Sequence, residues 1–306
     1  MPNITPIALQ VDTPGAARMQ AWIGWAPLAV LPMAAIALRS VLVPWVFMWL
    51  LATAIFAGCK WQTWWELRAA KRALSWRRSA AYLLLWPGMD ADEFFETNFE
   101  KRRIEPREWL AALGKALAGV ALIWVSARVV PLSHPLLAGW AGMVGLVLFL
   151  HFGTFHLIAL AWQRAGIHAE SIMQRPLALQ SLSELWGKRW NLGFRKLSYS
   201  LVFRPVQRRF GVVAGTLGAF LASGLIHELV ISVPARAGYG LPTAYFLAQG
   251  LGVLAERSAV GQRLGWGHGI RGRLWAALVA VGPLFCLFHP WFVLRVMLPF
   301  LRAIGG

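Results

Sequence analysis

Long apolar runs alternate with shorter basic or Pro/Gly-containing segments along most of the chain. A helix that crosses a bilayer needs about 20 apolar residues. By this measure the runs predict membrane spans at residues 22–38, 40–58, 109–130, 136–162, 211–233, 242–256 and 274–299. The span at 242–256 is short, and Pro283 and Pro290 are expected to kink or divide the last one. The pattern predicts an all-α polytopic membrane protein with about seven to eight transmembrane helices in a single membrane-embedded domain, residues 1–306.

Composition supports this class, because 58% of the residues are hydrophobic and only 14% are charged. A net charge of +17 would indicate nucleic acid in a soluble protein. Here the cations lie in the connections between apolar runs, where they face anionic lipid, so the expected partner is the bilayer and not nucleic acid. Cys59 and Cys286 stand alone in apolar sequence, which predicts packing roles and no metal cluster.

The basic residues also predict an orientation. They collect in residues 59–108, 163–210 and 257–273, whereas the alternate connections, 131–135 and 234–241, contain only Arg236. Basic connections stay on the cytoplasmic side, which places the N-terminus in the cytoplasm. No cleavage pattern of a signal peptide follows the first apolar run, so that run is expected to remain. The Ala, Arg and Trp bias and the short loops suggest a bacterial inner membrane, although a protein of the endoplasmic reticulum would have a similar pattern.

The two longer basic connections mix aromatic residues with cations, which predicts interfacial helices in the cytoplasmic loops. The first such helix is expected within 61–78. An acidic group follows it, and because no histidine is close in the sequence, we expect these carboxylates to face water and to bind no metal. The group consists of Asp90, Asp92, Glu93 and Glu96.

In the second connection, Ser181 and Glu184 have the S-x-x-E spacing of a capping box. A helix is therefore expected to begin there and to run to about Leu192. Trp186 and Trp190 would share one face of it, and Asn191 would lie about 100° further round. Such a helix would direct Asn191 toward a cavity. The alternative is that Asn191 only caps a helix end.

A histidine and a glutamate, His227 and Glu228, lie within the apolar run 211–233. Ionisable residues at such a position are costly and usually functional. A neutral imidazole is an effective general base near pH 7, so His227 is the predicted base. Glu228 lies 100° from it on a helix and is expected to pair elsewhere. Ser223 shares the face of His227, which leaves a nucleophilic serine as an alternative.

His227 and Glu228 belong to a short motif, Ser-Gly-Leu-Ile-His-Glu-Leu at 223–229. A second motif, Leu-Trp-Gly-Lys-Arg-Trp-Asn at 185–191, precedes it, and Arg-Pro-Val at 204–206 lies between the two. Over roughly 172–256 the chain resembles the wax synthase branch of the membrane-bound O-acyltransferases, although Leu185 and Lys188 stand where an aromatic residue and an arginine often occur. The resemblance implies a helix bundle around an intramembrane tunnel, with His227 as catalytic base, Asn191 as the second signature residue, and Trp186 and Trp190 in the tunnel wall.

The function expected from both lines of reasoning is transfer of a fatty acyl group from acyl-coenzyme A, a co-substrate, to the hydroxyl of a lipophilic alcohol, with no cofactor. A compact group of cations at the cytoplasmic mouth is expected to bind the phosphates of the donor, or alternatively to anchor the segment at the membrane surface. The cations are Lys188, Arg189, Arg195 and Lys196. Two alternatives remain: the same chemistry on a sterol, glyceride, saccharide or secondary metabolite, and a non-catalytic transporter or scaffold.

Overall fold

The computed structural model describes residues 14–70 and 74–305, so the N-terminal residues 1–13 and the cations Lys71 and Arg72 lie outside the described part. Every regular element within those ranges is a helix or helical turn. The α-helices are α1 (Pro14–Ala37), α2 (Pro44–Ala70), α3 (Trp76–Leu85), α4 (Ala91–Phe94), α5 (Pro106–Val129), α6 (Pro135–Val147), α7 (Phe155–Arg164), α8 (Leu182–Glu184), α9 (Arg195–Ser198), α10 (Arg204–His227), α11 (Val233–Ala235), α12 (Leu241–Arg257), α13 (Ala259–Leu264), α14 (Gly269–Val281), α15 (Leu284–Leu287), α16 (Pro290–Phe292) and α17 (Leu298–Ala303). The π-helical turns are η1 (Leu148–Thr154), η3 (Leu185–Arg189), η5 (Tyr199–Phe203), η6 (Glu228–Ser232) and η7 (Val293–Met297), and the 3-10 turns are η2 (Pro176–Ala178) and η4 (Leu192–Phe194).

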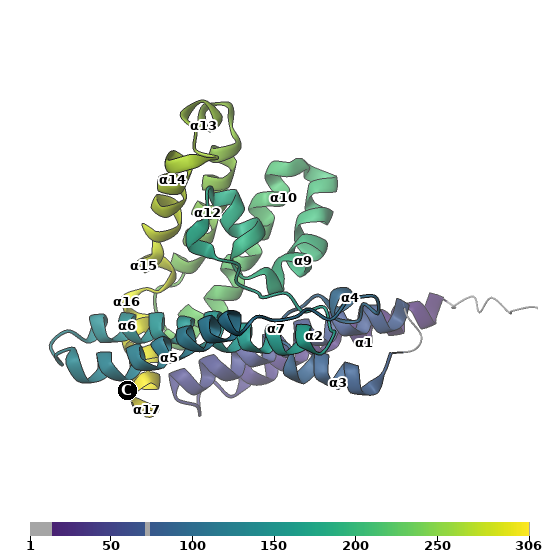
Figure 1. Ribbon diagram of the computed structural model, residues 1–306, viewed down its shortest axis with the longest axis horizontal. Helices are drawn as coiled ribbons and strands as arrows, with labels where there is room; N and C mark the ends of the chain where they lie inside the picture. Colours follow the sequence, from purple (N-terminus) through teal and green to yellow (C-terminus); the bar gives the residue numbers. More distant parts are fainter. Residues whose placement is uncertain (1–13, 71–73, 306) are drawn as a thin grey trace, which may run out of the picture.

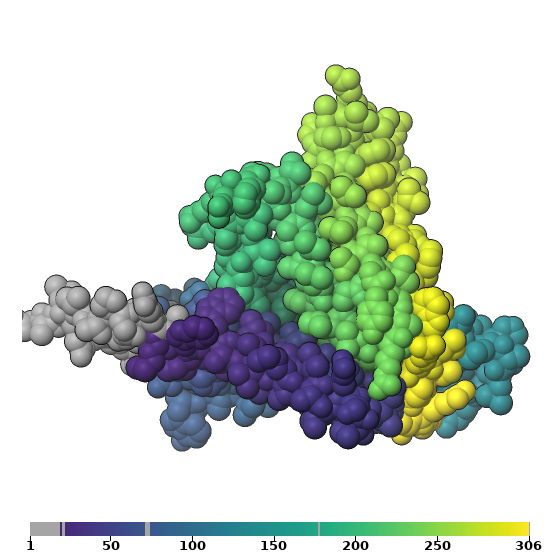
Figure 2. Space-filling model, turned by 180° about the vertical axis from the view of Figure 1, so that it is seen from behind, coloured from purple at the N-terminus to yellow at the C-terminus, as the bar shows by residue number. Residues whose placement is uncertain are grey.

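The helices form two groups (Figure 1). The first is a layer in which α1, α2, α5, α6 and α7 run along the long axis of the molecule. The second group, with α10, α12 and α14, stands steeply on this layer, and α16 and α17 lead the chain back down to it. In the space-filling view the surface is hollowed between the α9–α10 segment and α12, above α1 (Figure 2). The two motifs belong to the upright group.

In the part of the chain that the structure describes, five helical stretches are long and apolar enough to cross a membrane, which confirms the all-α multi-pass class. They are Pro44–Ala70, Pro106–Val129, Pro135–Arg164, Leu192–Ala235 and Gly269–Leu287, and the apolar stretch Trp22–Ala37 of α1 is shorter. The predicted span 242–256 corresponds to α12, which has 17 residues. The last predicted span is divided at both prolines, as expected: α14 ends before Pro283 and α16 begins at Pro290. Seven to eight crossings around a tunnel remain a prediction.

The helix predicted within 61–78 is not a separate element, because α2 runs to Ala70, residues 71–73 lie outside the described residues and α3 begins at Trp76. Its position in the membrane interface stays a prediction. Residues 61–70 continue α2 without a break, and the aromatic side chains of this end pack inside the protein, where Trp64 is 6% exposed. Lys60, expected in a loop, is 1% exposed and places its ammonium group 3.3 Å from the centre of the Tyr82 ring. Lys60 thus contacts Tyr82 of α3, which follows α2 in the chain, and the charge pattern alone does not reveal this contact.

A reversal of the chain at Gly211 positions the second motif. Gly211 has φ 84° and ψ 172°, so the helical hydrogen bonding stops there, and residues 212–227 return beside residues 195–210. Pro205 lies at the start of α10, directly after η5, and the chain stays helical through it. The turn before it, η5, has π-helical hydrogen bonding, in which the Arg204 N–H donates to the carbonyl of Tyr199 five residues back.

Candidate active site

His227 is the last residue of α10 and lies directly before η6. Its Nδ1 lies 2.7 Å from the carbonyl oxygen of Ser223. A carbonyl oxygen only accepts, so Nδ1 carries the proton in this bond and donates it. In the neutral imidazole the lone pair is therefore on Nε2, the nitrogen that remains to act as a base.

An aromatic bridge joins His227 to the first motif. The Phe246 ring of α12 lies 4.4 Å from the His227 ring and 5.9 Å from the Trp186 ring, measured between centroids. Trp186 also packs edge-on against Phe220 of α10, at 5.7 Å. The motif at 185–191 and the motif at 223–229 therefore meet on one side chain of α12.

The helix of the first motif begins where predicted but ends earlier. The Ser181 hydroxyl accepts the N–H of Glu184 at 3.0 Å, which confirms the N-cap, while the Glu184 carboxylate accepts the N–H of Gln180 at 2.6 Å and not that of Ser181. The helix ends at Arg189, not near Leu192, because a π-helical turn closes it. Trp190 is already extended, with φ −108°, so the prediction that both tryptophans share a helix face is wrong.

Asn191 adopts the left-handed conformation, with φ 48°, which asparagine tolerates better than most residues. Its backbone N–H donates to the Met173 sulfur at 3.3 Å. Among the described residues its side-chain amide has no hydrogen-bond partner. Asn191 follows the end of η3 and occupies the N-cap position of η4, so its role at a helix end remains an alternative to a catalytic one. Three residues later Phe194 packs in the same apolar cluster as Leu229 and Val230, which directly follow the His227–Glu228 pair. Asn191 and His227 share no hydrogen bond or ring contact in the described part of the chain.

The predicted phosphate-binding cations divide into two kinds. Arg189 is held by the Glu184 carboxylate at 2.6 Å and by the carbonyl of Arg175 at 3.1 Å, so its guanidinium fastens the neighbouring segment. This bond lowers the pKa of Glu184, chiefly through the hydrogen bond from Arg189. Lys188 and Arg195 are exposed, and Arg195 donates to the carbonyl of Gly187 at 3.0 Å. These two cations face solvent beside the motif.

The acidic group does not simply face water. Lys196 binds Asp90 and Asp92 at 2.8 and 2.7 Å, so this cation is already paired. His168, remote in the sequence, binds Glu96 at 2.8 Å and lies 3.4 Å from Glu93.

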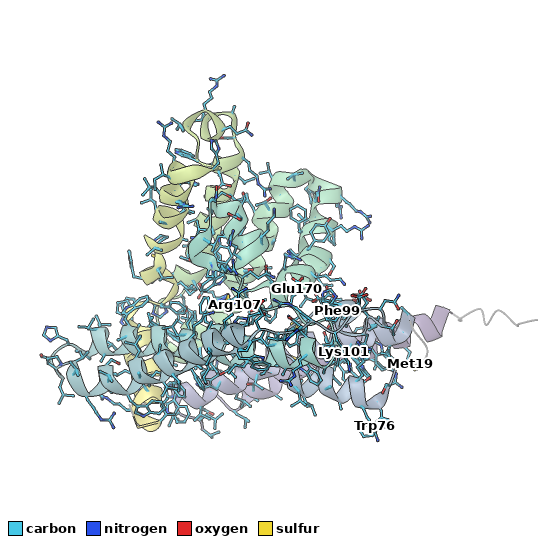
Figure 3. The ribbon with its side chains drawn as sticks, in the orientation of Figure 1. Met19, Trp76, Phe99, Lys101, Arg107 and Glu170 are labelled. Carbon is cyan, nitrogen blue, oxygen red and sulfur yellow. The ribbon has the colours of Figure 1, made fainter. Side chains whose placement is uncertain are left out.

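The imidazole of His168 stacks on Phe99, with ring centroids 4.5 Å apart. Glu170 and Phe99 lie where the layer meets the upright group (Figure 3). Burial lowers the pKa of His168, but the hydrogen bond to Glu96 and the charges of Glu93 and Glu170 raise it more. Its net pKa is therefore above the ordinary value.

Glu228 pairs away from His227, as predicted. One oxygen of its carboxylate accepts the N–H of Gly240 at 2.9 Å and the N–H and hydroxyl of Thr243 at 3.1 and 3.0 Å. These donors form the start of α12, so Glu228 anchors that helix. Near it, the buried His289 accepts the N–H of Phe292 through Nδ1 at 3.1 Å, which leaves its Nε2 as a donor and not as a base.

Part of the chain matches known proteins. Residues 169–248 match the sequence model of the membrane bound O-acyl transferase family. Relatives from Arabidopsis thaliana include a probable long-chain-alcohol O-fatty-acyltransferase 1, 36% identical over 73 residues (21% of this chain and 21% of the relative). A probable long-chain-alcohol O-fatty-acyltransferase 7 is 30% identical over 106 residues (31% and 30%). An acyl-CoA–sterol O-acyltransferase 1 is 30% identical over 86 residues (24% and 25%).

The matched part spans less than a third of each of these relatives. The segment that matches the family model, residues 169–248, contains Asn191, His227 and Phe246. Residues 169–248 are therefore similar to the membrane-bound O-acyltransferases, and the named relatives support a resemblance to the wax synthase branch, as the two motifs predicted.

Proposed function

We propose that this protein is a membrane O-acyltransferase that moves a fatty acyl group from acyl-coenzyme A to the hydroxyl of a lipophilic alcohol. The observation that carries the proposal is the state of His227, whose Nδ1 is bound to the Ser223 carbonyl and whose Nε2 has no hydrogen-bond partner among the residues that the structure describes. A group held in this tautomer within an apolar helix suits a general base. The sequence match supports the same chemistry.

The reaction is a direct transfer. As the alcohol oxygen attacks the thioester carbonyl, Nε2 of His227 takes the hydroxyl proton. The new C–O bond forms, the C–S bond breaks, and the proton passes to the departing sulfur of coenzyme A. No covalent acyl-enzyme is required, so Ser223 serves through its carbonyl group.

Asn191 is the proposed partner of His227. A side-chain amide without a partner is able to donate to the thioester oxygen as negative charge develops there. Two backbone hydrogen bonds hold the chain on either side of Asn191 and support this role. The backbone N–H of Gln174 donates to the carbonyl of Arg189 at 2.8 Å, and the backbone N–H of Leu192 donates to the carbonyl of Ile172 at 2.9 Å. The amide is thus held on a braced turn.

The two ends of the donor have different proposed sites. Lys188 and Arg195 are exposed beside the motif and are suited to the phosphates of coenzyme A. The aromatic side chains of Trp186 and Phe246 form an apolar wall next to His227, which suits the acyl chain. The segment 197–203 lies against the first part of residues 212–227 and is proposed to line the path between these ends.

The acceptor proposed first is a long-chain alcohol, which would give a wax ester. A sterol is the second candidate, because one relative is named as an acyl-CoA–sterol O-acyltransferase. Both acceptors present a hydroxyl on an apolar body, so the same base serves either. Only an acceptor panel separates them.

The test uses the purified full-length chain in lipid nanodiscs with labelled acyl-coenzyme A and a panel of fatty alcohols, sterols and glycerides. His227→Ala is expected to lower ester formation by about 10²–10⁴, the usual cost of losing a positioned base. His268→Ala, which changes an exposed histidine outside the motifs, is the matched control and should keep full activity. Normal turnover by folded His227→Ala protein would refute the assignment and favour a transporter or scaffold.

A further inference from the structure

One face of α12 contacts both motifs. Phe246, Gln249 and Glu256 lie along this face at helical spacing. Phe246 contacts His227, and the fully buried Gln249 accepts the indole N–H of Trp186 at 3.3 Å while donating to the carbonyl of Val279 at 2.7 Å. This helix therefore connects the base to the segment that carries Asn191.

Glu256 makes the joint at the far end of α12. Its side chain is 4% exposed, and its two oxygens accept the N–H groups of Leu182 at 2.6 Å and of Ser183 at 3.2 Å. The next residue, Arg257, donates to the Ser183 hydroxyl at 3.0 Å. Within the described ranges no cation pairs with the Glu256 carboxylate.

A buried carboxylate is costly unless its hydrogen bonds are satisfied, and the first N–H groups of a helix need acceptors. Here the N–H groups of Leu182 and Ser183 donate to the buried carboxylate of Glu256, and that carboxylate supplies the acceptors that the start of α8 needs. The joint is specific as well as favourable, since both carboxylate oxygens are used and each has one backbone donor.

We propose that Glu256 is a positioning residue for the acyl transfer proposed above. It fixes the start of residues 182–191 to α12, and α12 holds His227 through Phe246. The position of the Asn191 amide relative to His227 Nε2 is thus set from the two ends of one helix. Glu256 touches no substrate in this scheme and acts through Asn191.

The informative variant is Glu256→Gln, which keeps the size and shape of the side chain. Its amide nitrogen cannot accept an N–H, so one of the two bonds is lost and a donor faces a donor. We expect kcat to fall about 10-fold, the effect of one hydrogen bond to a charged group, with the donor KM unchanged. Glu108→Gln is the matched control, because Glu108 accepts the N–H of Glu105 at 3.1 Å at the start of α5, away from both motifs.

A double-mutant cycle distinguishes positioning from a general loss of stability. Asn191→Gly removes the amide while keeping a residue that tolerates the left-handed conformation. If Glu256 acts through Asn191, Glu256→Gln should lower kcat by less than about 2-fold in the Asn191→Gly protein. Equal losses in both backgrounds would show a structural role only and would overturn the proposal.

Hydrogen–deuterium exchange gives a readout that does not need activity. The amides of residues 182–189 should exchange faster in Glu256→Gln and at the normal rate in Glu108→Gln. Unchanged exchange in Glu256→Gln would overturn the positioning role alone. Absence of ester formation by the unmutated protein would instead defeat the proposed function, and with it any role of Glu256 in that reaction.

Discussion

The close contact between α10 and α12 makes a sharp prediction at Gly224, three residues before His227. A Cβ atom at this position would lie 2.8 Å from the Thr243 Cα atom, whereas ordinary contact begins at 3.4 Å. The difference is 0.6 Å, and the obstructing atom is backbone, which does not rotate away. Gly224→Ala must therefore push the two helices apart at the level of His227.

The consequence should be catalytic more than structural. His227 is on α10 and Phe246 is on α12. A separation of this size therefore moves the His227 imidazole away from the Phe246 ring and from the proposed reacting atoms. A misplacement of about 1 Å is able to cost 10²-fold in rate, so we expect Gly224→Ala to lower kcat at least 10-fold.

Gly218→Ala is the control on the same helix. A Cβ there would lie 3.6 Å from the nearest atoms of Val206, an ordinary contact, and replacing a helical glycine by alanine favours the helix by about 1 kcal/mol. Ester formation is measured for both variants after size-exclusion chromatography has shown each to be folded. Normal kcat in Gly224→Ala, or an equal loss in Gly218→Ala, would refute the reasoning.

Three further predictions follow from charge and exposure. Replacing Lys188 and Arg195 by alanine should raise the donor KM more than it lowers kcat, and an unchanged donor KM would exclude a role in phosphate binding. His168→Phe keeps the stacking but removes the charge. Because the pKa of His168 is raised, the charged imidazole stabilises the fold fully at a pH below the ordinary pKa of about 6.5, and this stabilisation is lost as the pH rises through the raised pKa. The variant should therefore lose more in Tm at about pH 6 than at about pH 9. In a cysteine-free background, a cysteine at Arg209 should be shielded from an impermeant thiol reagent in intact cells and one at the exposed Tyr239 should react, and labelling in the opposite sense would reverse the topology.

Features that depend on a few neighbouring residues could be predicted from the sequence. The helical multi-pass class follows from the apolar runs, the N-cap at Ser181 from its spacing to Glu184, and the interruptions at Pro283 and Pro290 from proline chemistry. The pairing of Glu228 away from His227 follows from the 100° step between consecutive helical residues. Each of these is local, so no knowledge of the partners was needed.

The errors arose where a distant partner or a change of helical type decides the outcome. Lys196 meets Asp90 across 106 residues, and no periodicity encodes that encounter. The π-helical turn at 185–189 ends the motif helix early and turns Trp190 out of line. Arg208 and Arg209 shortly before Gly211 form the pattern of a helix C-terminus with a glycine beyond it. The sequence therefore indicated the reversal, but Gly211 is also the first residue of the apolar run 211–233, which predicts a single span.

The adjacent pair His227 and Glu228 shows how one short motif is able to serve two purposes. The helical step directs the imidazole to Phe246 of α12 and the carboxylate to the start of the same helix, at Gly240 and Thr243. Glu228, next to the proposed base, therefore anchors α12, the helix whose Phe246 ring packs against His227. A change at Glu228 should accordingly impair transfer through the placement of α12, while a change at His227 should remove the base itself.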